Sequence, residues 1–111
     1  MLRSLVPWLV LAAAAPAGAW QGQSLRAAAQ LTGLTTGMAA ACQIPTRPVL
    51  HAFRDLMDRK NIQGAERKRL VRLVSQSHDR SYATQHKPGA MSCPEVQEQV
   101  TSTIRRLERA K

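Results

Sequence analysis

The chain has 111 residues, of which 44% are hydrophobic and only 4% aromatic, and its 16 Lys+Arg against 7 Asp+Glu give a formal net charge of +9. This length fits one domain and excludes a multi-step enzyme with a separate cofactor domain. The two cysteines are too few for a disulfide-dense miniprotein. What remains is one small basic module.

The first 19 residues have the parts of an export signal. After a short basic start, residues 5–15 form an apolar run, which is shorter than the roughly 20 residues that a membrane helix needs. Residues 16–19 are small or proline, as signal peptidase requires. We expect cleavage after Ala19, with cleavage after Ala17 or an uncleaved anchor as alternatives. Residues 20–111 then form a single domain without a membrane span, periplasmic or secreted, with a net charge of +8 because only Arg3 is lost.

Four helical patterns follow, and no stretch alternates as a β-strand does. The first covers residues 24–42 and is apolar on two sides, so we expect neighbouring helices on both. One side carries Leu31, Leu34, Met38 and Ala41, and the other carries Ala29, Gly33, Gly37 and Ala40. The Gly33-x-x-x-Gly37 spacing predicts a close helix crossing, with a membrane-type dimer as the alternative. Each glycine also weakens a helix by about 1 kcal/mol relative to alanine, so a break near Gly33 is a further alternative.

The second and third patterns are amphipathic. The second begins at the proline-rich turn of residues 44–48, where Thr46 can cap a helix and Pro48 suits its first turn. It runs to about residue 60, and its apolar face carries Val49, Leu50, Phe53, Leu56 and Met57. The third covers residues 65–83, and its inward side carries Leu70, Val71, Val74 and Tyr82.

The last helix has the clearest start. Residues 87–90 contain the Pro-Gly pair of a type II turn. Ser92 then predicts an N-cap, Pro94 fits the first turn, and Glu95 completes a capping box. The apolar stripe of this helix carries Val96, Val100, Ile104 and Leu107. The four patterns together predict an all-α fold, a small four-helix bundle within residues 20–111.

The two cysteines lie at helix ends: Cys42 ends the first pattern and Cys93 opens the last. In an exported chain a disulfide between them is expected. It would close a loop of about 50 residues, which stabilises the fold by roughly 4 kcal/mol in the chain-entropy model. The alternative is a reactive Cys93 thiol at a helix N-terminus, but the chain has no Cys-x-x-Cys motif. We therefore expect one disulfide that staples the bundle.

The histidines are the candidates for metal binding or catalysis. His51, His78 and His86 lie in three segments and lack the spacing of a zinc motif. On the helical wheel His78 lies on the inner side of the third helix, which favours a packing role. His51 is one turn from Asp55, a pairing that can orient an imidazole but is common on surface helices. Haem-attachment, phosphate-loop and nucleophile motifs are absent. We therefore predict no catalytic, metal-binding or cofactor-binding residues.

The basic charge supplies a candidate contact surface. Arg69, Arg72 and Arg80 fall on one outward stripe of the third helix, with Lys68 beside it. Such a stripe could contact phosphates, lipid headgroups or an acidic protein. The aromatic platforms that single-stranded nucleic-acid binding usually adds are scarce here. The alternative is a solvated helix face without a partner.

Several features together resemble known families of exported proteins. They are Cys42, the Phe53-Arg54-x-x-Met57 helix, the His78-x-x-x-Tyr82 region, and Cys93 at the start of the last helix. This arrangement resembles small exported bacterial helical proteins of unknown function with two well-separated cysteines. It is also similar to periplasmic acid-stress chaperones, which are small, helical and held by one disulfide. The chain departs from the chaperones in lacking a tryptophan close before the first cysteine and in having few carboxylates to act as acid switches.

These observations predict a non-enzymatic exported protein that binds another macromolecule, as an accessory or chaperone-like protein of the cell envelope. An alternative is a cationic protein that binds an anionic polymer or membrane surface through the Arg69/Arg72/Arg80 stripe. A third hypothesis, the least favoured by the motifs, is a small hydrolase that uses His51 or His78.

Overall fold

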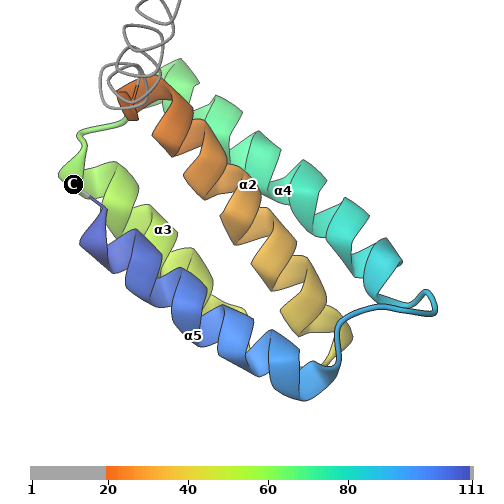
Figure 1. The fold of residues 1–111 in the computed structure, drawn as a ribbon. Coiled ribbons are helices and arrows are strands. Elements are labelled where there is room, and N and C mark those ends of the chain that lie inside the picture. The colour runs from red at the N-terminus through yellow and green to blue at the C-terminus, as the bar shows by residue number, and fades with distance from the viewer. Residues whose placement is uncertain (1–19, 111) are drawn as a thin grey trace, which may run out of the picture.

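The chain folds into helices joined by short turns. The computed structural model describes residues 20–110, with side chains from residue 25 onward. Its elements are α2 (Trp20–Ala41), α3 (Arg47–Arg59), α4 (Gly64–Gln85) and α5 (Cys93–Arg109), as Figure 1 shows. The described residues contain no strand, so the predicted all-α class and the four helices are confirmed. The predicted export signal, residues 1–19, lies outside the described residues.

The helices form a bundle around α2. α2 packs extensively against α4 on one side and against α3 and α5 on the other, and α3 also packs against α5. α4, in contrast, has its extensive contacts with α2 alone. The four helices alternate in direction along the chain, so α2 runs parallel to α4 and α3 runs parallel to α5 (Figure 1). None of the described helices has both the length and the apolar character needed to cross a membrane.

Two glycines allow α2 and α4 to touch backbone to backbone. A Cβ atom built on Gly33 would lie 2.4 Å from the carbonyl oxygen of Val74, and one built on Gly37 would lie 2.4 Å from that of His78. Ser81, buried on α4, donates a hydrogen bond of 2.6 Å to the carbonyl oxygen of Leu34. The close helix crossing predicted from the glycine spacing is therefore confirmed. The alternative of a break near Gly33 is wrong, because α2 is continuous from Trp20 to Ala41.

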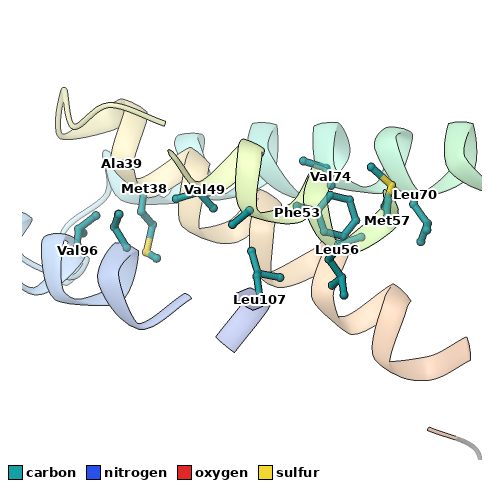
Figure 2. Close-up of a cluster of buried hydrophobic side chains, with 13 residues drawn as sticks. Met38, Ala39, Val49, Phe53, Leu56, Met57, Leu70, Val74, Val96 and Leu107 are labelled. Carbon is teal, nitrogen blue, oxygen red and sulfur yellow. The ribbon is translucent and has the colours of Figure 1, made fainter. Parts of the chain in front are cut away.

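The apolar core lies mainly between α3 and its neighbours. Figure 2 shows the cluster, to which α3 contributes the buried Val49, Phe53, Leu56 and Met57, as predicted. Leu50, placed on the same face by the sequence pattern, is 41% exposed. α5 adds Val96, Val100 and Leu107 to the core, while Ile104 is half-buried at its edge.

The sequence pattern predicts more buried residues on α4 than the structure has. Leu70 and Val74 are buried as expected, but Val71 is 51% exposed and Tyr82 is 43% exposed. Because α4 has its extensive contacts with one helix only, a narrow strip of its surface suffices for that packing. Tyr82 instead lies between His78 of its own helix and His86 just after the helix, with its ring centroid 6.3 Å from that of His78 and 4.7 Å from that of His86.

Polar groups inside the bundle are paired. Thr35 on α2 and Thr103 on α5 are fully buried, and their hydroxyls lie 2.9 Å apart in a hydrogen bond that links the two helices. Thr32 donates a 2.7 Å hydrogen bond to the carbonyl oxygen of Ala28 one turn earlier. Among the described residues, every buried side-chain nitrogen or oxygen has a hydrogen-bond partner. These threonines therefore fit between closely packed helices without leaving an unsatisfied donor or acceptor.

The helix ends follow the sequence signals in most places. Cys42 and Cys93 form the predicted disulfide, with their Cα atoms 5.6 Å apart. Ser92 and Glu95 form the predicted capping box, and hydrogen bonds from Ser92 lower the pKa of the Glu95 carboxyl below its usual 4.5. Gly89 has a φ of +84°, as the third residue of a type II turn requires. Thr46 does precede α3, but its side chain makes no capping hydrogen bond.

Candidate functional site

One apolar stripe of α2 is only partly covered by its neighbouring helices. α4 covers the glycine side, but the side with Leu31 and Leu34 lies between α4 and α5, which have no extensive contact with each other. Leu34 is 46% exposed and Leu31 is half-buried. The expected helices are present on both sides of α2, with α4 on one side and α3 and α5 on the other, but α4 and α5 flank Leu34 without closing over it.

This open side forms a groove along α2. A hollow of about 600 Å³ lies over Leu34 and Met38, bounded by α4, the start of α5 and Met91, which is 39% exposed. A second hollow of about 790 Å³ lies over Ala27 and Leu31, between α2, the end of α3 and the end of α5. We call this surface the α2 groove, with a floor made of Ala27, Leu31, Leu34 and Met38.

A third hollow joins the first two beside α4. It has a volume of about 490 Å³, and it shares Leu25 with the second hollow and Gln30 with the first. The three hollows thus follow one another along α2, with a lining residue in common at each step. The stripe of Arg69 and Arg72 forms part of its α4 wall.

The walls of the α2 groove are strongly basic. Six arginines from three helices line the three hollows: Arg26, Arg69, Arg72, Arg80, Arg106 and Arg109. Glu66 is the one acidic side chain among the described residues that line them. None of the six arginines makes an ion pair within the described part of the chain, whereas Arg67 pairs with Asp58 at 2.8 Å. The charge of the walls is thus not neutralised by the protein itself.

The structure brings together part of the basic stripe predicted from the sequence. Arg69 and Arg72 line one hollow, and Arg80 lines the adjoining hollow over Leu34. Lys68 is exposed on α4 and lines none of the three hollows. Sequence reasoning missed Arg26 on α2 and the pair Arg106 and Arg109 on α5. A helical wheel orders residues within one helix, whereas these arginines reach the groove through the packing of different helices.

The histidines stay apart. His51 is exposed on α3. His78 is half-buried against α2, with its Nδ1 3.0 Å from Oγ1 of Thr36, in agreement with the predicted packing role. The same Thr36 hydroxyl lies 3.1 Å from the carbonyl oxygen of Gly33, to which it can donate. His86 bonds through its Nδ1 to the carbonyl oxygen of Tyr82. Among the described residues, no three His, Cys, Asp or Glu side chains are grouped to hold a metal ion.

Comparison with known proteins gives no relative. No protein-family model matches the chain, and neither the curated proteins nor the solved structures compared with it include a match.

Proposed function

We propose that the protein is an exported, non-enzymatic binding protein that holds another macromolecule of the cell envelope in the α2 groove. The observation that carries this proposal is the apolar stripe of α2, which lies open between α4 and α5 with Leu34 46% exposed. A contiguous apolar surface with a polar rim is typical of an interaction site in a folded protein.

The walls of the groove are held in place by covalent and polar links. The Cys42–Cys93 disulfide joins the end of α2 to the start of α5. Ser81 ties α4 to the backbone of α2 at Leu34. Gln85 on α4 donates a hydrogen bond to the carbonyl oxygen of Met91, which fixes the segment between α4 and α5 at the rim. A groove held open in this way is preorganised, so a partner loses less free energy in ordering it.

The proposed location follows from the export signal at residues 1–19 and from the disulfide. Disulfides persist in oxidising compartments such as a periplasm or the cell exterior. An accessory subunit or a chaperone-like protein of the envelope would use a binding groove without any catalytic group.

Site-specific photo-crosslinking in cells tests the proposal. A photo-reactive amino acid at position 34 should form adducts with a macromolecule of the envelope, whereas the same group at position 50 should not. Leu34 and Leu50 are matched for this purpose, because both are helical leucines of similar exposure, 46% and 41%, and only Leu34 lines the groove. Equal adducts at both positions, or none at position 34, would contradict the proposal.

A second candidate function is direct binding of an anionic polymer or membrane surface through Arg69, Arg72 and Arg80. The observation that favours it is that these arginines make no ion pair within the described residues. Such binding should weaken steeply between about 50 and 500 mM salt. Arg72→Glu should weaken it further, whereas Arg54→Glu on the exposed surface of α3 should change it less. Binding that stays constant over this salt range would contradict this candidate.

A further inference from the structure

The floor of the α2 groove has the spacing of a helix-packing seam. Ala27, Leu31, Leu34 and Met38 follow one another at intervals of four, three and four residues. Alternating steps of four and three residues are the a and d spacing by which one helix packs along another in a coiled coil. Over this stretch the helix rises by about 17 Å, which is three turns. The seam is therefore long enough for a partner helix of about three turns.

The space above the seam fits a helix better than an extended chain. α4 and α5 both pack on α2 but have no extensive contact with each other, so the position between them, opposite α3, has no occupant among the described helices. A helix placed there would contact three helices at once and cover Leu31 and Leu34. An extended acyl chain lying on the floor would remain open to water along its outer side, because α4 and α5 do not close over the groove.

The positive charge of the groove walls indicates which charge the two sides of a partner helix should carry. Arg69, Arg72 and Arg80 lie on the α4 side, and Arg106 and Arg109 on the α5 side. Acidic residues on both flanks of a partner helix would meet these arginines, and the match would favour encounter and fix the register. A second copy of this chain would instead bring its own arginines opposite the same walls, and like charges disfavour that complex.

We propose that the occupant of the α2 groove is an amphipathic helix from another protein, with an apolar seam of about three turns and acidic residues on both flanks. This inference rests on the proposed function and specifies the chemistry of the partner. The mode is that of a helix in a groove, in which apolar anchors at helical spacing supply most of the affinity.

A designed peptide tests the inference on the disulfide-bonded exported protein. The probe is a fluorescent helical peptide of three heptads with leucine at the seam and glutamate on both flanks. One control peptide has lysine in place of every glutamate, and another has serine in place of every leucine. Fluorescence anisotropy, at peptide concentrations below self-association, should show binding of the acidic peptide and at least about tenfold weaker binding of both controls.

Variants of the protein locate the contact. Leu34→Asp should weaken binding of the acidic peptide at least about tenfold, while Leu50→Asp should leave it within about twofold. Arg80→Glu should weaken the acidic peptide and strengthen the lysine peptide, whereas Arg54→Glu on α3 should do neither. Because Arg80 is exposed on α4, its variant keeps the test valid even if Leu34→Asp lowers the stability of the fold.

Four results would overturn the inference. They are equal binding of the acidic and lysine peptides, binding that Leu34→Asp and Arg80→Glu leave unchanged, a Leu34-dependent dimer in sedimentation, and Leu34-dependent binding of anionic lipid vesicles without binding of the acidic peptide. The photo-crosslinking experiment distinguishes a wrong partner chemistry from a wrong proposed function. Adducts specific to position 34 together with no peptide binding would refute the acidic helix and leave the groove as a binding site.

Discussion

Gly33 provides a quantitative test of the contact between α2 and α4. In Gly33→Ala the new Cβ would lie 2.4 Å from the Val74 carbonyl oxygen, whereas ordinary contacts begin at 3.4 Å, so α4 would have to move away by about 1 Å. The obstructing atom belongs to the backbone and cannot rotate away. Overpacking of this kind costs roughly 1–3 kcal/mol, and a backbone obstacle places the effect near the upper end.

The intrinsic helix propensity acts in the opposite direction. Alanine favours a helix over glycine by about 1 kcal/mol, so the net destabilisation of Gly33→Ala should be about 2 kcal/mol. For a domain of this size each kcal/mol shifts Tm by about 4–8 °C, which predicts a fall of about 8–16 °C. Circular dichroism during thermal and urea unfolding measures both quantities. Ala27→Gly, on the face of α2 that no helix covers, measures the propensity contribution in the same helix.

A double variant identifies the obstacle. Ser77→Gly removes the side-chain atom that would lie 2.5 Å from the new Cβ but leaves the Val74 carbonyl in place. Gly33→Ala combined with Ser77→Gly should therefore remain destabilised. If Gly33→Ala instead raised Tm, as alanine does on an open helix face, the close contact of α2 with α4 would be refuted.

Three further predictions concern the ends of the helices. Reduction of the Cys42–Cys93 disulfide, which spans 51 residues, should lower the free energy of unfolding by about 4 kcal/mol, and an unchanged urea midpoint with reductant would contradict this. Ser92→Ala should cost about 1 kcal/mol through loss of the α5 cap, whereas Ser102→Ala on the exposed surface of the same helix should be nearly neutral in the same assay. Because hydrogen bonds from Ser92 lower the pKa of Glu95 in the folded state, its contribution to stability is complete above about pH 4.5 and is lost as the pH falls through the lowered value. Glu95→Gln should reduce this acid dependence of Tm, and an unaltered pH profile would count against it.

Local signals predicted the helix boundaries and the covalent link. The Ser92 and Glu95 capping box acts within one turn, so four residues of sequence contain all the interactions that define it. The disulfide could be predicted because a chain with two cysteines has one intramolecular pairing available. The glycine spacing predicted a close crossing because few other residues let backbones approach so closely.

The sequence predictions that were wrong concern how many neighbouring helices cover each helix. An apolar face shows that a residue can be buried but not that another helix covers it. Val71 and Leu34 both belong to apolar stripes, yet both remain exposed because α4 has its extensive contacts with α2 alone and the space between α4 and α5 stays open. The set of arginines that line the groove was also hard to predict from single helices. Arg69 and Arg72 could be grouped on one helix, whereas Arg106 joins their groove through tertiary packing.

Methionine methyl groups give the most direct test of the α2 groove as the site for an acidic amphipathic helix. Met38 lies in the floor of the groove and Met91 at its rim. Met57 on α3 is buried in the core and lines none of the three hollows. In NMR spectra of the protein labelled at its methionine methyls, titration with the acidic peptide should shift the Met38 and Met91 signals and leave Met57 unchanged. Unshifted Met38 and Met91 signals at saturating peptide, or equal shifts with the lysine peptide, would contradict the account.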